Sequence, residues 1–428
     1  MTNGEIMKSI FSKRLRKTAV CCGLSLFLLM AVRTKAQETA ASSTQDETIK
    51  QLAQRVQELE QQVKQLQANQ AAPPAATPAP EAPAPVEAPT VNEVAPRLRM
   101  TVFGDVGAQG YNGSNTSFFF GSLDLFMTAR LSDHVSALGE ILFLPDINDN
   151  TIESDVTRLL LTYRPNDYFK ASIGRYNTWV GYYNSTFNKG EFLETTTDRP
   201  FIYAFDDFGG VLPMQDVGIT ATGKIPSGSL GLNWVAEAGN GDDWGLDVEP
   251  AQNHDDHNGS KAVNGGLFIR PDKFSGLQVG FSLRHDNLSI PGPAVHETIP
   301  TFHVVYVNSN YEILNEAVLD RHTLLATGAA FNTVGWYSQF SRRYRSFRPY
   351  FRYQYFNAPN SDPVYAYAPP NEYAPHDYDG FVGRVNGPSA GLRYEAGEHS
   401  ALKFQYDRFS LRDFPSENGL TSQFAFTF

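Results

Sequence analysis

Acidic and basic side chains recur at alternate positions of amphipathic segments between residues 98 and 428. In an extended strand alternate side chains share one face, so this period gathers the charges on a common surface. Charges of both signs that face each other across water create a transverse field, which orients charged solutes and breaks no bond. Three of the candidate residues, Asp198, Asp206 and Asp207, belong to the segment 177–212. The full set is Arg130, Arg158, Asp198, Asp206, Asp207, Arg284, Glu312, Glu316, Arg348, Arg352 and Arg393.

A second group has residue types that suit a metal ion. His254, Asp255, Asp256 and His257 are consecutive, and imidazole and carboxylate groups ligate Zn²⁺ when a rigid frame holds them. Without such a frame these residues form a solvated acidic loop, so we expect no metal site here, with divalent-ion binding as the alternative. The sequence contains no G-x-S-x-G elbow, no P-loop and no dinucleotide fingerprint. We therefore expect that the protein is not an enzyme and binds no cofactor. The remaining alternative is a hydrolase that uses a Ser/His pair on the wall of a barrel.

The charged positions belong to a series of amphipathic segments that are bounded by turn residues. In one of them, Leu123, Leu125 and Met127 alternate with Asp124 and Thr128. We expect antiparallel strands near residues 98–110, 117–131, 134–144, 153–164, 168–176, 213–225, 228–239, 262–270, 275–285, 299–307, 310–320, 333–343, 347–357, 385–396, 399–410 and 420–428.

The composition favours a membrane barrel as the frame for these strands. Aromatic residues make up 13% of the chain, with 30 Phe and 20 Tyr, while the mean hydropathy is −0.33. A single apolar run of helical length excludes a bundle of transmembrane helices. A barrel hides a polar interior, exposes an apolar band and concentrates aromatics at the interfaces. We therefore predict an all-β fold, a transmembrane antiparallel β-barrel of about sixteen strands.

The connections between the strands also indicate a barrel. Short segments such as 132–133, 226–227 and 308–309 alternate with longer ones, which include 177–212, 240–261, 286–298 and 358–384. Short turns at one end and long loops at the other are typical of outer-membrane barrels. A barrel of this size encloses an open aqueous lumen. An open lumen implies the passage of small hydrophilic or charged solutes.

The final strand has the clearest alternation. Phe424, Phe426 and Phe428 are separated by small or polar residues, so their rings share a face that would meet lipid. We expect this strand to close the barrel. Its phenylalanines resemble the C-terminal aromatic signal that outer-membrane assembly machinery reads.

The first 36 residues have the features of a secretory signal peptide. Basic residues precede a short apolar run, Thr18–Val32, and Thr34–Ala36 resembles a cleavage site. Cleavage after Ala36 removes seven of the 35 basic and one of the 46 acidic residues, which leaves a net charge of about −17. So acidic a chain disfavours nucleic acid as a partner. Cys21 and Cys22 both fall within the signal, so the mature chain contains no disulfide.

Two segments separate the signal from the predicted barrel. Residues 37–70 contain a heptad seam, which predicts a short periplasmic α-helical coiled coil, with a solitary amphipathic helix as the alternative. The seam residues are Ile49, Leu52, Val56, Leu59, Val63 and Leu66. Residues 71–97 are rich in Pro and Ala, which predicts a stiff, disordered linker.

The segment 177–212 is too long for an ordinary loop. It contains nine aromatic residues, and such a composition argues against disorder. We expect it to fold into the barrel and narrow it. The alternative is an extracellular loop that packs on a neighbouring subunit.

Four short motifs resemble a known family. They are Gly174–Thr178 (GRYNT), Asp198–Pro200 (DRP), Phe208–Pro213 (FGGVLP) and Tyr311–Glu316 (YEILNE). Over residues 98–428 the chain resembles the general outer-membrane porins of the phosphate-selective porin superfamily. The resemblance implies homotrimers of sixteen-stranded barrels, each with a constriction loop, in Gram-negative bacteria. Some related porins also resemble this chain in an N-terminal coiled coil.

Selectivity for phosphate does not follow from this resemblance. A phosphate channel needs a ladder of Arg and Lys side chains, whereas the predicted inner face mixes both signs. The best candidate for a basic wall consists of Arg342, Arg343, Arg345, Arg348 and Arg352. The alternative for this cluster is a periplasmic turn that touches lipid headgroups.

Two functions fit these features. The first is a porin for passive diffusion of small solutes, located in the outer membrane with its N-terminus in the periplasm. The alternative is a structural envelope protein whose barrel anchors a periplasmic coiled coil that contacts the cell wall. The expected partners are outer-membrane lipid, two further copies of the chain, solutes in transit and, under the alternative, the cell wall.

Overall fold

The computed structural model describes residues 97–146, 151–187, 190–204, 210–242, 256, 258–288, 290, 292–367, 383–412 and 415–428. Several predictions concern residues outside this set. They include the signal peptide, the coiled coil with its seam, and the linker up to residue 96, together with Asp206, Asp207, His254, Asp255 and His257.

Alternating side chains form sixteen β-strands within the described residues. They are β1 (Arg97–Tyr111), β2 (Ser117–Arg130), β3 (Val135–Asp146), β4 (Thr151–Tyr163), β5 (Lys170–Asn177), β6 (Gln215–Lys224), β7 (Leu232–Gly239), β8 (Ala262–Ile269), β9 (Leu277–Leu288), β10 (Val295–Val307), β11 (Tyr311–Leu324), β12 (Ala330–Arg342), β13 (Phe347–Ala358), β14 (Gly383–Gly397), β15 (Ser400–Leu411) and β16 (Glu417–Thr427). The helices are α2 (Tyr182–Thr186), η1 (Phe201–Tyr203), η3 (Gly228–Leu230), η5 (Asp272–Phe274) and η6 (Val364–Tyr367). In the described part of the chain, none of the helices is long and apolar enough to cross a membrane.

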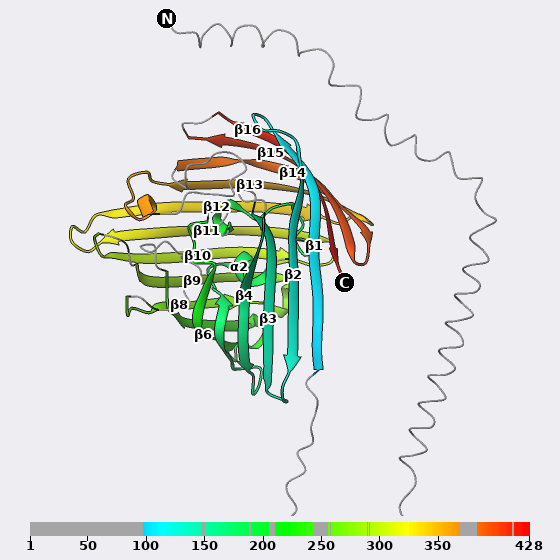
Figure 1. The fold of residues 1–428 in the computed structure, drawn as a ribbon. Helices are drawn as coiled ribbons and strands as arrows, with labels where there is room; N and C mark the ends of the chain where they lie inside the picture. Colours follow the sequence, from blue (N-terminus) through cyan, green and yellow to red (C-terminus); the bar gives the residue numbers. More distant parts are fainter. Residues whose placement is uncertain are drawn as a thin grey trace, which may run out of the picture. The chain divides into compact units, whose positions relative to one another are not determined.

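The strands form one closed antiparallel barrel (Figure 1). Each strand pairs with its neighbours in sequence, and β1 also pairs with β16. At this seam Phe103 lies opposite Thr427, and Tyr111 lies opposite Gly419. Closure removes the free edges of the sheet, so every strand has two hydrogen-bonded neighbours. The prediction of an all-β, sixteen-stranded antiparallel barrel is confirmed.

The two faces of the barrel differ as the alternating pattern predicts. On β12, Trp336 and Phe340 are 38% and 46% exposed, whereas Tyr337 and Gln339 are almost completely buried. Side chains of a strand point to opposite faces in turn. The outward face is therefore apolar, and the inward face carries polar groups that other parts of the chain cover. This arrangement suits a barrel that lipid surrounds.

The connections divide the barrel into two ends. We call one the turn end, because it carries short connections such as 131–134, 308–310 and 398–399. The opposite loop end carries the longest connections, 178–214, 240–261 and 359–382. Some loop-end connections are nevertheless short, such as 112–116 and 325–329.

The long loop predicted at 286–298 is wrong. β9 continues to Leu288, and β10 begins at Val295. The outward residues here, such as His296 and Thr298, are polar, so the sequence lacks the apolar alternation of a lipid-facing strand. The inward residue Glu297 is completely buried. In the same way, β7 starts at Leu232 and not at 228, because the short helix η3 precedes it.

β16 closes the barrel as predicted. The backbone N–H of Phe428 donates to the carbonyl of Val102 at 3.0 Å, and the Phe428 carbonyl accepts from Val102 at 2.8 Å. The rings of Phe424, Phe426 and Phe428 follow one another with centroid separations of 6.2 and 6.3 Å. Gln423, on the opposite face, is buried. The three aromatic rings therefore share one side of the closing strand.

Candidate functional site: the loop inside the barrel

Residues 178–214 connect β5 to β6, and we call them the inner loop. Its two ends lie together, since the Thr178 N–H donates to the carbonyl of Met214 at 3.0 Å. The amide of Asn184 donates to the carbonyls of both Thr178, at 3.0 Å, and Met214, at 2.8 Å. These hydrogen bonds close the base of the loop. A closed base lets a long connection act as one compact unit.

Glu316, on the inward face of β11, binds the first part of the inner loop. Its carboxylate accepts the backbone N–H groups of Tyr182 at 2.6 Å and Tyr183 at 3.0 Å. It also accepts the hydroxyls of Tyr203 at 2.8 Å and Tyr337 at 2.5 Å. Four donors thus satisfy the hydrogen-bonding capacity of this buried carboxyl group.

Other polar groups of the wall hold further parts of the loop. Glu312 on β11 accepts the hydroxyl of Thr195 at 3.1 Å. Glu237 on β7 accepts the backbone N–H of Trp179 at 2.9 Å, and the hydroxyl of Ser282 on β9 donates to the Trp179 carbonyl at 2.8 Å. The inner loop is therefore bound on both sides of β9.

Asp198 of the inner loop forms an ion pair with Arg352 of β13. Arg352 also donates to the Asp198 carbonyl at 3.0 Å, and the amide of Gln405 on β15 donates to the Asp198 carboxylate at 2.9 Å. The Arg352 side chain is completely buried, whereas 39% of the Asp198 side chain is exposed. Of this pair, Asp198 is the member that remains accessible to water.

Two more cations bind carbonyl groups of the loop. Arg393 on β14 donates to the carbonyl of Glu194 at 2.7 Å, and Lys403 on β15 donates to that of Thr196 at 2.7 Å. Carbonyl oxygens are acceptors that a buried cation needs when water is excluded. Burial raises the pKa of the Glu194 carboxyl, and Arg199 opposes this effect.

Apolar contacts complete the attachment of the loop. The rings of Tyr183 and Tyr203 stack at 5.8 Å with an angle of 7° between their planes. Ile202 of η1 lies against Gly335 of β12, where an added Cβ would be 2.0 Å from the Cγ2 atom of Ile202. Glycine at this position therefore lets η1 approach the wall.

The structure brings five predicted site residues together at the inner loop. They are Asp198, Glu312, Glu316, Arg352 and Arg393. The other described candidates lie elsewhere on the wall. Arg284 is buried among acids at the loop end, Arg158 pairs with Glu140 at 2.7 Å, and Arg348 is half-buried with a guanidinium nitrogen 3.5 Å from the Ser341 hydroxyl.

The arginines proposed as a basic wall do not share one surface. Arg342, Arg343 and Arg345 are exposed at the β12–β13 turn, while Arg348 is half-buried and Arg352 is covered by the inner loop. Exposure decreases from the turn end inward. The proposed basic wall therefore consists of exposed arginines at a turn and one arginine, Arg352, that attaches the inner loop.

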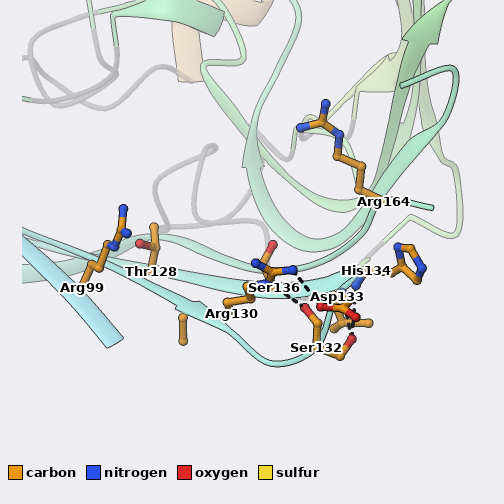
Figure 2. A pocket seen from close by; sticks show the side chains of 10 residues that line it. Arg99, Thr128, Arg130, Ser132, Asp133, His134, Ser136 and Arg164 are labelled. Atoms are coloured by element: carbon orange, nitrogen blue, oxygen red, sulfur yellow. Dashed lines mark hydrogen bonds and ion pairs between the residues drawn. The ribbon is translucent and has the colours of Figure 1, made fainter. Parts of the chain in front are cut away.

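Arg130 belongs to a separate pocket at the turn end (Figure 2). This open pocket has a volume of about 440 Å³, and Arg99, Arg130 and Arg164 are among the residues that line it. Arg130 pairs with Asp133 at 2.8 Å, and both side chains are well exposed. No hydrogen bond or ion pair joins these arginines to the described part of the inner loop.

Sequence reasoning missed the amide side chains that bind the loop. Gln354 on β13 accepts the Phe201 N–H at 2.9 Å, and Gln423 on β16 donates to the Thr197 carbonyl at 3.4 Å. These side chains are uncharged, so a pattern of charged residues does not identify them. Alternation nevertheless places Gln354 on the same face as Arg352, so the period of the strand was the available signal.

Of the four predicted metal candidates, the structure describes Asp256. Its carboxylate pairs with the Lys261 ammonium and accepts the N–H groups of Gly259, at 2.7 Å, and Asn258, at 3.1 Å. The hydrogen bond from Lys261 is the main cause that lowers the pKa of Asp256. These partners satisfy Asp256 without an ion.

The barrel is similar to several solved structures. The anion-selective porin from Comamonas acidovorans matches at 10% identity with a TM-score of 0.53, over 78% of this chain and 100% of that one. OmpF of Salmonella typhi, in complex with daunomycin, matches at 11% identity with a TM-score of 0.51, over 77% and 97%. The trimer form of OmpT, an outer-membrane protein of Vibrio cholerae, matches at 10% identity with a TM-score of 0.50, over 78% and 100%.

At such low identities the likeness establishes the fold alone. The described chain has the sixteen-stranded fold of general outer-membrane porins. No protein-family model matches the sequence, and no curated protein matches it.

Proposed function

We propose that this chain is a bacterial outer-membrane porin, through which small hydrophilic or charged solutes diffuse passively. The inner loop is the observation that carries the proposal. A closed barrel with an apolar outer face binds this loop to its inward face by polar contacts from β7 round to β16. A loop that is fixed to the wall in this way narrows a water-filled lumen at a defined place. The fold shared with known porins supports the same conclusion.

Electrical recording tests this function. The full chain, folded in detergent and added to a planar lipid bilayer, should produce stable conductance steps in potassium chloride. Liposomes that contain the protein should swell in isotonic solutions of small sugars but not of large dextrans. Insertion of the folded barrel without conductance or swelling would contradict the proposal.

Two finer assignments belong to this proposal. The motifs Gly174–Thr178 and Tyr311–Glu316, which support membership of the phosphate-selective porin superfamily, lie at β5 and on β11. The second motif contains Glu312 and Glu316, which both bind the inner loop. We also propose a homotrimer, by analogy with the trimer form of OmpT.

A second function is supported by the segments that precede the barrel. The heptad seam of residues 49–66 and the Pro/Ala-rich linker are features that a simple pore does not need. In this alternative, the barrel anchors a periplasmic coiled coil that contacts the cell wall. Both functions are compatible in one molecule.

A further inference from the structure

The loop end of the barrel holds a cluster of buried carboxylates that the inner loop does not use. All of these acids are at most 3% exposed, and they come from β6, β9, β10, β11 and the connections 240–261 and 359–382. They are Asp216, Asp242, Asp286, Glu297, Asp320 and Asp362. The side chains of Arg284 and His322 lie among them.

Arg284 compensates one half of this cluster. Its guanidinium pairs with Asp216 and Asp286, each at 3.1 Å, and lies 3.7 Å from Asp242. One cation thus serves three acids. Glu297 is the farthest partner, with a carboxylate oxygen 3.8 Å from the Arg284 Nε atom. Among the described residues, Arg284 forms no ion pair with Asp320 or Asp362, so the other half of the cluster has no arginine counter-charge.

That other half has the spacing of metal ligands. The Nε2 atom of His322 lies 3.5 Å from a Glu297 oxygen and 3.4 Å from an Asp320 oxygen. One ligand atom from each of these residues lies within 4.8 Å of the other two. These distances are too long for good hydrogen bonds. Ligand atoms at about 2.1 Å from a tetrahedral ion are themselves about 3.4 Å apart.

Glu297 gives independent support for a ligand. The residue is completely buried, and neither carboxylate oxygen has a hydrogen-bond donor among the described residues. The Nε2 atom of His322, which faces Glu297, also lacks a hydrogen-bond partner among the described residues. Buried polar atoms without partners are unfavourable. One cation placed between the three side chains would give a partner to the His322 Nε2 atom and to the Glu297 oxygen that faces it.

The surrounding groups orient His322 for this role. Its Nδ1 atom lies 2.7 Å from a carboxylate oxygen of Asp362. An imidazole that donates one ring N–H to a carboxylate presents the lone pair of its other nitrogen, which is the usual arrangement of metal-binding histidines. The hydroxyl of Tyr365 donates to Asp320 at 3.2 Å and fixes that side chain as well.

We propose that Glu297, Asp320 and His322 bind a divalent transition-metal ion of the Zn²⁺ type at the loop end of the barrel. One imidazole and two carboxylates form a three-ligand site of the kind that zinc occupies, with a further position for water. The ion would connect β10 and β11 to the 359–382 connection through the His322–Asp362 contact. This site does not depend on the proposed porin function, because it requires only the folded barrel.

Calorimetry with zinc chloride tests the site. The full chain, stripped with a chelator and free of any affinity tag, should bind one Zn²⁺ ion with high affinity. His322→Gln and Glu297→Gln should abolish this binding, and Asp362→Asn should weaken it by about 10- to 100-fold. His303→Gln is the matched control. His303 is another buried histidine, on β10, and its ring forms a hydrogen bond with Gln278 instead. Cobalt substitution should give the visible absorption of a tetrahedral site.

The folding of each variant is the control for these measurements. Heat-modifiable migration of the barrel shows whether a variant is folded. If His322→Gln is folded but does not bind Zn²⁺, the loss of binding is due to the site. Failure of the wild-type protein to bind Zn²⁺ would overturn the proposal. Equal binding by the wild type and His322→Gln would also overturn it, as would binding that disappears with His254→Gln and His257→Gln. Should His322→Gln fail to fold, Glu297→Gln and Asp362→Asn decide by the same comparison.

Discussion

Single residues of the inner face have clear structural partners. Glu316 receives four donors, and Arg352 and Arg393 bind carbonyl groups of the inner loop. A charge that is removed from water is stable only when such partners surround it. Solvent exposure therefore distinguishes the residues that attach the loop from those that solutes could contact. Asp198 and Arg348 are partly exposed, whereas Glu316 and Arg352 are buried.

Glu316→Gln should loosen the inner loop. The amide offers one acceptor oxygen where the carboxylate accepts four donors, and each hydrogen bond to a charged group contributes about 1.5–3 kcal/mol. We expect noisier and larger single-channel conductance, together with faster proteolysis within residues 178–214. Glu398→Gln at the exposed β14–β15 turn is the control. Unchanged current in both variants would exclude a role of Glu316 in holding the loop.

Arg348 and Arg352 should differ in their effect on ion selectivity. Arg348→Ala removes a half-exposed cation and should shift the reversal potential under a salt gradient toward cation preference, with the inner loop still protected from proteolysis. Arg352→Ala leaves Asp198 without its ion pair, so loop protection should fall as well. Equal reversal potentials in the wild type and Arg348→Ala would show that Arg348 does not face the solute path.

The inner loop is the element on which the proposed function depends. Its base is closed by Thr178, Asn184 and Met214, and η1 packs where β12 lacks a side chain. Polar attachment and close packing act together, because buried polar groups fix one arrangement and the glycine makes room for it.

Gly335→Ala should displace η1 from the wall. The new Cβ would lie 2.0 Å from Ile202, and overpacking of this kind destabilises by about 1–3 kcal/mol. Thermal melting and channel noise measure the effect. Gly265→Ala on β8 is the matched control, since an added Cβ there meets nothing within 4 Å. The double variant Gly335→Ala with Ile202→Ala should restore the behaviour of the wild type, and failure of this rescue would refute the packing argument.

The closing strand β16 should affect assembly more than conductance. Phe428 continues the ladder with Val102, and 74% of its surface is exposed on the outward side of the barrel. Phe428→Ala should lower the yield of folded protein in the outer membrane several-fold and leave the conductance of the remaining channels unchanged. Phe404→Ala is the control, because Phe404 is an outward phenylalanine of the neighbouring strand β15. Equal yields from both variants would contradict a special role of Phe428.

At the scale of the whole molecule, the described barrel has an apolar outer face and a polar interior, as membrane insertion requires. A trimer should produce conductance steps in groups of three and a cross-linked species of three chains. Single, uncorrelated steps would instead indicate independent barrels.

Deletion of residues 38–96 separates the two proposed functions. The shortened chain should retain solute uptake if the barrel alone forms the channel. If the preceding segment also anchors the envelope, detergent sensitivity and vesicle release should rise. Loss of uptake with a normal envelope would count against the anchoring function.

The sequence by itself determined the sixteen strands, their antiparallel order and the polarity of each face. These properties follow from local alternation and turn residues, which act over a few positions. It also placed Glu312, Glu316 and Arg352 on the inward face. The polar strand extension at 295–298 escaped this reasoning, because its outward residues His296 and Thr298 are polar.

Only the tertiary structure decided which groups meet inside the barrel. Glu316 is 134 positions from Tyr182, and Arg352 is 154 positions from Asp198. Contacts over such separations arise when the sheet closes and the inner loop folds against it, and no local pattern encodes them. Glu297 and His322 are closer in sequence, and they face each other because the consecutive strands β10 and β11 pair in register. Barrel closure is therefore the physical reason why the contacts of the inner loop become visible in three dimensions alone.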